Sequence, residues 1–336
     1  MPPQTRDIVV VGASAGGVEA LRALVGSLHS NLPAALLVVL HMPAGGTSAL
    51  VPILARSGRL PAVTARNDVE LEHGVVYVAP PDHHLLVDDD RTVLSVGATE
   101  NRHRPAINAL FRSVAVSAGP RAIGVMLSGN LDDGVAGLRA IVRRGGTAIA
   151  QSPAEALYPA MPENALQEVA IDHVLPAGEI GGLLGKLTAE EVGPDVGGEL
   201  DALLELENRI AHGLPVLPAD ASAELGPASG YMCPDCHGSL MELGAHRYRC
   251  RVGHAWSGES LLRAKGAAFE LALGTALRSL DEKVALARRM CDRANERGNP
   301  QIAERCRRAI GETTYAAETL RAHLATLHSS GAVPPS

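Results

Sequence analysis

A glycine-rich turn directly after a short apolar run constrains the fold of this chain more than any other feature. Residues 8–11 are Ile-Val-Val-Val, and they are followed by Gly12-Ala13-Ser14-Ala15-Gly16-Gly17. Such a run is typical of a strand buried in a parallel sheet, and residues 18–28 then have helical spacing. A serine among glycines at a strand-to-helix turn has the layout of a nucleophile elbow. Dinucleotide-binding domains begin in the same way, so the turn alone leaves both alternatives open.

The second predicted strand separates these two interpretations. Residues 36–40 are apolar and lead into His41-Met42-Pro43. A dinucleotide site normally has Asp or Glu near this point, where it binds the ribose hydroxyls. An imidazole here instead favours a general base, which is expected beside a nucleophilic serine. A nucleotide-dependent oxidoreductase is therefore the weaker alternative.

A third predicted strand end supplies carboxylates. The apolar run at residues 122–127 leads to Asp132 and Asp133, and either side chain is suited to cap a helix expected at residues 135–144. The carboxyl ends of parallel strands meet at one edge of an open sheet, where ligands bind. One of the two aspartates would therefore orient His41. This completes the nucleophile, base and carboxylate that acyl transfer needs.

From about residue 7 to residue 187, the chain resembles the catalytic domain of the chemotaxis protein-glutamate methylesterases. The shared motifs are the elbow, His41-Met42-Pro43, Tyr77-Val78-Ala79-Pro80, Asn101-Arg102-His103-Arg104-Pro105, Asp133-Gly134 and Gly145-Gly146 before a strand. The resemblance implies a triad of Ser14, His41 and Asp133, and it alone decides for Asp133 over Asp132. It also implies hydrolysis of glutamyl methyl esters on a methylated chemoreceptor-like protein, with glutamine deamidation as a related reaction. Alternating short strands and helices agree with its α/β fold, a doubly wound, mostly parallel sheet.

Two positions near the triad depart from that family. Ala15 stands where relatives often have a hydroxyl residue, and Gly129-Asn130-Leu131 replaces the usual Gly-Met-Gly. We expect backbone amides near Ala15 to bind an oxyanion. We expect Asn130 to make the pocket wall more polar.

A basic segment precedes a helix expected at residues 106–118. Its members are Arg102, His103 and Arg104. Basic groups at a helix start suit anionic, glutamate-rich substrates, so these residues are expected to line the substrate pocket. A solvated helix cap is an equally good interpretation.

Four residues with metal-ligand spacing follow much later in the chain. They are Cys233, Cys236, Cys250 and His254. A C-x2-C pair followed by C-x3-H is typical of a closed, tetrahedral zinc site, so we predict one structural zinc outside the chemistry. A redox-active cysteine pair is the alternative, and His237 and His246 are alternative ligands. The catalytic reaction itself needs no cofactor.

Shifts in composition predict four parts of the chain. They are a catalytic domain at residues 1–190, a linker with a short helix at 191–228, a zinc ribbon at 229–258 and a helical hairpin at 259–330. The hairpin is expected from apolar residues at three- and four-residue steps, broken at Gly298-Asn299-Pro300. Self-packing of the hairpin, docking of a partner and formation of a homo-oligomer all agree with this pattern.

Composition narrows the classes of partner. The net charge of -7 and the aromatic content of 2% argue against nucleic acid, which needs basic surfaces and stacking platforms. No apolar stretch reaches the length of a membrane span, and no signal-peptide pattern opens the chain, so we expect a cytoplasmic protein without membrane insertion. The remaining alternative function is a non-catalytic regulatory scaffold that binds a signalling partner through the ribbon and the helices.

Overall fold

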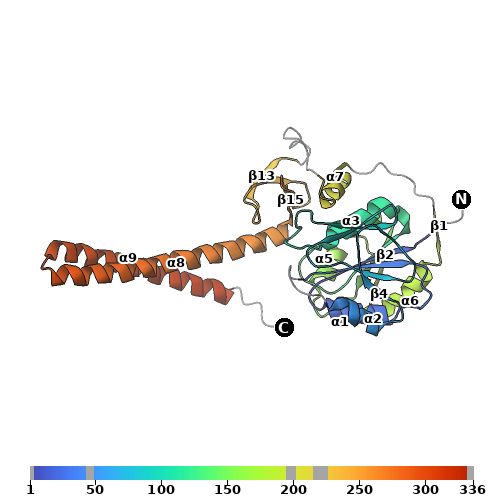
Figure 1. The fold of residues 1–336 in the computed structure, drawn as a ribbon, viewed down its shortest axis with the longest axis horizontal. Coiled ribbons are helices and arrows are strands. Elements are labelled where there is room, and N and C mark those ends of the chain that lie inside the picture. The colour runs from blue at the N-terminus through green and yellow to red at the C-terminus, as the bar shows by residue number, and fades with distance from the viewer. Residues whose placement is uncertain (1–3, 43–48, 194–201, 215–225, 331–336) are drawn as a thin grey trace. The chain divides into compact units, whose positions relative to one another are not determined.

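The computed structural model describes residues 4–42, 49–193, 202–214 and 226–330 of the chain (Figure 1). These residues belong to two compact units, which are described separately: unit 1 is Met1–Leu261 and unit 2 is Leu262–Ser336. Half of the predicted linker (residues 194–201 and 215–225) and Pro43 lie outside the described residues. The sequence predicts the linker helix at residues 199–211, and its first three residues are among those not described.

A seven-stranded parallel sheet forms the centre of unit 1, with the strand order β11-β10-β9-β2-β3-β6-β4. Its strands are β2 (Ile8–Ala13), β3 (Ala35–Leu40), β4 (Ala62–Thr64), β6 (Val76–Val78), β9 (Ala122–Met126), β10 (Thr147–Gln151) and β11 (His173–Leu175). The chain runs outward from β2 through β3 to β4 at the edge, places β6 between β3 and β4, and then crosses to the other side of β2 at β9. Strands β2 and β9 therefore form a topological switch point, where open α/β sheets bind ligands. The predicted fold class is confirmed.

Helices cover both faces of this sheet. One layer consists of α1 (Gly17–Gly26), α2 (Leu50–Ser57) and α6 (Ala177–Leu187), and the other of α3 (Ile107–Ala118), α4 (Val135–Arg143) and α5 (Ala160–Glu168). Within β2, Val9 and Val11 face the first layer, whereas Ile8 and Val10 face the second. Burial on both sides explains why the strands have unbroken apolar sequences. A short 3-10 turn, η1 (Gly119–Arg121), leads from α3 into β9.

The apolar runs at residues 85–87 and 93–96 predict an antiparallel hairpin at the edge of the main sheet. The hairpin is antiparallel, but its expected place is wrong. It consists of β7 (His84–Asp88) and β8 (Arg91–Ser95), which join β5 (Val69–Glu70) in a separate sheet of order β5-β8-β7. The Thr92 hydroxyl accepts a hydrogen bond from the amide of Val69 (3.2 Å), which helps to hold β8 beside β5. A further small antiparallel pair joins β1 (Gln4–Thr5) to β12 (Glu191–Val192).

The cysteine-rich segment is a four-stranded antiparallel ribbon within unit 1. Its strands are β13 (Ala228–Met232), β14 (Ser239–Glu242), β15 (Arg247–Cys250) and β16 (Ala255–Ser257). Helix α7 (Ala202–Ala211) packs on it through Leu206 and Ile210, which contact Met241 and Leu243. Ala211, at the end of α7, packs instead with residues of β7 and α3. Helix α7 therefore contacts both the ribbon and the part of unit 1 formed by β7 and α3.

Two long helices form most of unit 2. Helix α8 (Gly258–Glu296) begins in unit 1, and α9 (Pro300–Ser330) follows a short break (Figure 1). The helical pattern predicts that Cys291 and Cys306 are buried, and both lie buried between the two helices. It also places Phe269 and Ile302 on the apolar faces of the hairpin, but both are exposed. Among the described residues, no helix has both the length and the apolar character needed to cross a membrane.

Candidate active site

Ser14 lies in the turn between β2 and α1, at the carboxyl edge of the sheet. Its amide donates a hydrogen bond to the carbonyl of Ser128 (2.9 Å), and the Ser128 hydroxyl donates to the carbonyl of Ala15 (2.8 Å). Gly16 has a φ of 68°, a left-handed conformation that glycine adopts without a steric penalty. Together these features fix a sharp turn and hold the serine at the switch point.

His41 and Asp133 meet Ser14 from the ends of the two strands that flank β2. The Nδ1 atom of His41 is 3.2 Å from the Ser14 hydroxyl, and its Nε2 atom is 2.7 Å from Asp133 Oδ2. The same carboxylate oxygen accepts the amide of Ile107, at the start of α3, at 2.7 Å. The structure therefore brings the three residues of the predicted triad into one hydrogen-bonded chain.

The protonation state of Asp133 fixes the tautomer of His41. Burial acts to raise the pKa of Asp133, but the hydrogen bond from His41 and the nearby imidazoles outweigh it and lower the pKa to about 2. An ionised carboxylate only accepts hydrogen bonds, so the proton of neutral His41 resides on Nε2. Nδ1 then has a free lone pair facing the Ser14 hydroxyl, as a general base requires.

Asp132 has a different environment from its neighbour. Its Oδ1 atom accepts the hydroxyl of Ser257, at the end of β16, at 2.6 Å. Burial raises its pKa to about 6; the bond from Ser257 opposes this rise and the charge of Glu259 adds to it. Asp132 thus faces the ribbon, while Asp133 faces His41.

Of the three predicted substrate-lining residues, His103 lies closest to the triad. Its ring stacks on that of His41 with the centroids 3.6 Å apart and an interplanar angle of 6°. Burial and the neighbouring His41 lower the pKa of His103 to about 4, so the ring is neutral at pH 7. Arg102 instead pairs with Asp235 of the ribbon, and Arg104 with Asp82, so both guanidinium groups have intramolecular partners.

The residues where the chain departs from its family lie in two turns, one after β2 and one after β9. Asn130 is exposed. The amides of Ala15 and Gly16 donate to no backbone oxygen among the described residues, and these two residues directly follow Ser14 in the turn between β2 and α1. Gly129 leaves no room for a side chain, because an added Cβ would lie 2.9 Å from the Cβ of Ser14 and 2.3 Å from the sulfur of Met161.

Two supporting residues were not identified from the sequence. The Ser128 hydroxyl, besides its bond to Ala15, accepts the amide of Tyr158 (2.9 Å) and so ties the elbow to the segment before α5. The Ile107 amide fixes the Asp133 carboxylate. Ser128 directly follows a predicted strand, and this position could have identified it as a residue of the site. Ile107 acts through its backbone amide, which every residue except proline has, so its role cannot be recognised from the sequence.

The four predicted metal ligands form one cluster in the ribbon. Their donor atoms all lie within 4.8 Å of one another. Cys236 Sγ is 3.6 Å from Cys250 Sγ, and His254 Nδ1 is 3.4 Å from Cys250 Sγ and 3.8 Å from Cys233 Sγ. Tetrahedral zinc, with Zn–S of about 2.3 Å and Zn–N of about 2.0 Å, would separate such atoms by about 3.5 to 3.8 Å. The Cys3His cluster can therefore hold a metal ion, and its donor set fits zinc.

A serine, a histidine and an aspartate in hydrogen-bond sequence at the carboxyl edge of a parallel sheet form the constellation that defines serine hydrolases. The model of the CheB methylesterase family matches residues 9–184. The chain belongs to the CheB methylesterase family. The predicted resemblance is thereby confirmed for about half of the chain.

Curated relatives and a solved structure agree with this assignment. The protein-glutamate methylesterase/protein-glutamine glutaminase 2 of Methanosarcina mazei is 37% identical over 179 residues, which are 51% of this chain and 49% of that protein. The corresponding protein 3 of Anaeromyxobacter dehalogenans is 44% identical over 170 residues, which are 50% of each. The chain thus spans about half the length of these relatives. The crystal structure of the Thermotoga maritima CheB methylesterase catalytic domain matches with a TM-score of 0.52 and 32% identity, covering 55% of this chain and all of that domain.

Proposed function

We propose that this chain hydrolyses glutamyl methyl esters on a signalling protein through an acyl-enzyme formed on Ser14. The hydrogen-bonded sequence of Ser14, His41 and Asp133 is the single observation that most supports this function. Methylesterase activity is also the first activity in the names of the relatives.

In the acylation step, the Ser14 oxygen bonds to the ester carbonyl carbon while its proton passes to His41 Nδ1. Asp133, which accepts a hydrogen bond from Nε2–H and stays ionised, stabilises the imidazolium that forms. The amides of Ala15 and Gly16 would bind the negative oxygen of the tetrahedral intermediate. His41 then returns the proton to the departing methoxide, and methanol leaves.

In the deacylation step, a water molecule gives a proton to His41 and attacks the acyl carbon. The Ser14 oxygen recovers its proton and the glutamate side chain is released. A glutamine side chain presents the same acyl group with ammonia as leaving group, and the relatives' names include glutaminase activity. Deamidation is therefore the second reaction to be tested at this site.

Methanol release from a methylated chemoreceptor fragment tests the proposal. Ser14→Ala should lower kcat by about 10⁴-fold without loss of folding, because the nucleophile is removed while substrate contacts remain. Ser57→Ala, in α2, provides a matched control with normal activity. A folded wild-type protein that releases no methanol, or Ser14→Ala with full activity, would contradict the proposal and favour the non-catalytic scaffold.

We further propose that the Cys3His cluster binds one structural zinc. Cys233, Cys236, Cys250 and His254 would complete its coordination, leaving no position for water or substrate, so the metal would stabilise the ribbon and take no part in the reaction. Elemental analysis should give one zinc per chain. Cys236→Ser should lower this content strongly, and undiminished zinc in that variant would exclude the cluster as the site.

The identity of the substrate, the location of the protein and the division into domains are also proposals. We propose that the substrate is a methylated chemoreceptor-like protein in the cytoplasm. The domain division is proposed as in the sequence analysis, with residues 1–190 as the catalytic part. Self-association through α8 and α9 remains a prediction.

A further inference from the structure

The ribbon rests on the loop that supports His41. Asn101 and Arg102, two consecutive residues of this loop, have φ values of 51° and 68°. Non-glycine side chains adopt this left-handed conformation in succession only where the surroundings impose it. The loop at residues 99–104 is therefore held from outside.

Strand β16 and the metal-binding turn provide that support. The Asn101 amide donates to the Ala255 carbonyl (2.8 Å), and the Ala255 amide donates to the Thr99 carbonyl (3.2 Å). The Asn101 side-chain oxygen accepts the amide of Ser257 at 2.9 Å. Asp235, between Cys233 and Cys236, accepts the Thr99 hydroxyl at 3.0 Å. The loop is thus joined both to β16 and to the turn between β13 and β14.

Charged groups reinforce the same contact. Arg102 pairs with Asp235 (3.4 Å) and lies 5.8 Å from the ring centre of Trp256. Glu100, which is buried, binds Arg112 of α3 and also Arg249 of β15 (3.2 Å). The ribbon therefore contributes a buried cation to the base of the loop.

The loop held by the ribbon includes His103, which contacts the triad. The His103 amide donates to the Glu100 carbonyl (2.8 Å), and the Glu100 amide donates to the His103 carbonyl (3.2 Å), so the loop closes on itself. The His103 ring then lies flat against His41. A face-to-face neighbour at this distance limits how far the His41 ring can rotate away from Ser14 and Asp133.

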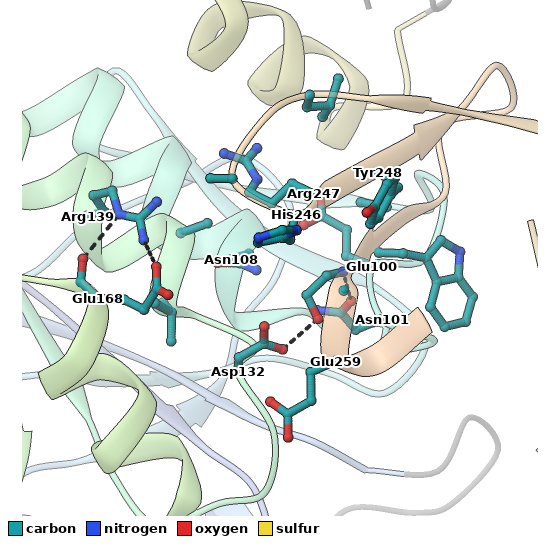
Figure 2. Close-up of a pocket in the computed structure, with 18 of the residues that line it drawn as sticks. Glu100, Asn101, Asn108, Asp132, Arg139, Glu168, His246, Arg247, Tyr248 and Glu259 are labelled. Carbon is teal, nitrogen blue, oxygen red and sulfur yellow. Dashed lines mark hydrogen bonds and ion pairs between the residues drawn. The ribbon is translucent and has the colours of Figure 1, made fainter. Parts of the chain in front are cut away.

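The other strand end is also in contact with the ribbon. Ser257 donates its hydroxyl to Asp132, the residue before Asp133, and Figure 2 shows Asp132 beside Asn101 and Glu259. A cavity of about 410 Å³ adjoins these contacts, between the ribbon and α3–α5. Its lining includes Asp132 and Glu100 but not Ser14, His41 or Asp133. The ribbon thus contacts both the loop at residues 99–104 and the loop that contains Asp132, and these contacts lie outside the cluster of Ser14, His41 and Asp133.

We propose that His103 is a positioning residue that holds His41 in line with Ser14, and that the metal-binding ribbon places His103 through the loop at residues 99–104. This inference rests on the proposed esterase function. It replaces the expectation that the metal site lies apart from catalysis: the metal takes no chemical step, yet its ribbon sets the geometry of the base.

Two substitutions in the full chain separate positioning from proton transfer. His103→Ala should lower kcat on a small methyl ester by about 10- to 100-fold with little change in KM, because His41 loses its alignment. His103→Phe retains a flat ring without a titrating nitrogen and should restore most of the activity. Equal loss in both variants would assign His103 to proton transfer, and normal activity in His103→Ala would remove its role; either result overturns the proposal.

Removal of zinc tests whether the ribbon positions His103. Trp256 is the only tryptophan and is buried, so its fluorescence reports whether β16 remains in place. Chelation of zinc should shift this fluorescence and lower the small-ester rate together, and added zinc should restore both. A shift without loss of rate, or no change in either signal after complete removal of zinc, would overturn the proposal.

Two arginine variants test the contact between Arg102 and the ribbon without removal of the metal. Arg102→Ala should lower kcat and alter the Trp256 emission with zinc content unchanged. Arg251→Ala, an exposed substitution in the ribbon, should affect neither. Identical behaviour of the two variants would contradict the proposal.

A fluorophosphonate probe distinguishes failure of this inference from failure of the proposed function. The Ser14 oxygen bonds to phosphorus, fluoride leaves, and the hydroxyl proton passes to His41. If the chain has another acyl substrate, the wild type releases no methanol but is still labelled at Ser14, and His103→Ala should be labelled more slowly. Equal labelling rates in wild type and His103→Ala would overturn the positioning role alone.

Discussion

Asp132 and Asp133 are adjacent in sequence but have opposite electrostatic environments. Asp133 accepts two hydrogen bonds and its pKa is lowered to about 2, whereas burial raises that of Asp132 to about 6. Sequence reasoning from strand ends left the choice between them open, and only the family resemblance decided it. The hydrogen bonds agree with that decision, because His41 contacts Asp133. Because the two pKa values shift in opposite directions, the two carboxylates change the free energy of unfolding with pH in opposite directions.

The raised pKa of Asp132 predicts a pH-dependent stability difference. The folded-state pKa of about 6 exceeds the usual value of 3.8, so its stabilising contribution is complete below about pH 4 and is lost as pH rises through 6. Asp132→Asn removes this loss and retains an acceptor for Ser257. The variant should therefore gain about 1 to 3 kcal/mol relative to wild type between pH 4.5 and 7.5.

Urea unfolding followed by Trp256 fluorescence at the two pH values measures this difference. Asp89→Asn, in the exposed turn between β7 and β8, removes a surface carboxylate and serves as the control. A stability difference between Asp132→Asn and wild type that does not change with pH would show that burial does not control this carboxyl group.

At the scale of elements, sequence patterns predicted the main sheet well. The short β-rich runs at residues 62–64 and 173–175, each between turn residues, also predict strands, and they form β4 and β11. The place of the β7–β8 hairpin was predicted wrongly, since its partner β5 has only two residues and little pattern. The contacts of the ribbon with residues 99–104 join segments more than 100 residues apart. No local spacing encodes such contacts, so the sequence could not show them.

A buried charge cluster joins three of these elements. Arg249 of β15 contacts Glu100 and also Glu207 of α7 (3.0 Å), while Arg112 of α3 pairs with Glu100 and Arg247 with Glu207. Burial acts to raise the pKa values of both glutamates, but the surrounding guanidinium groups outweigh it and lower them. Both carboxylates are thus ionised in the interior and depend on these arginines.

Removing the central cation should therefore be costly. Arg249→Met leaves Glu100 and Glu207 each with one arginine fewer, and we expect a loss of about 3 to 5 kcal/mol in the free energy of unfolding. Arg91→Met, which breaks an exposed pair with Asp68, should cost less than about 1 kcal/mol. Denaturant unfolding of the three proteins compares these costs, and similar values for both variants would contradict a structural role for the cluster.

At the scale of the whole molecule, all described contacts of the triad and of the ribbon lie within unit 1. A chain that ends after Gly266 keeps these contacts and should hydrolyse a small methyl ester at the rate of the full chain. A chain that ends after Leu187 loses α7 and the ribbon, and its rate should fall by about 10-fold or more because the 99–104 loop loses its support. Rate measurements on both truncated proteins, with circular dichroism to verify folding, test this expectation; equal rates would show that the ribbon is dispensable.

The buried position of Arg249 also limits how this protein can change over evolutionary time. A ribbon that met its neighbours only through an exposed apolar patch could be exchanged between proteins as an independent cassette. Here the cation is on the ribbon and its carboxylates are on the 99–104 loop and on α7. Loss of either carboxylate leaves excess positive charge in the interior, and loss of Arg249 takes one cation from each carboxylate. The ribbon, the helix and the loop are therefore expected to be inherited together, and to be replaced only by paired substitutions.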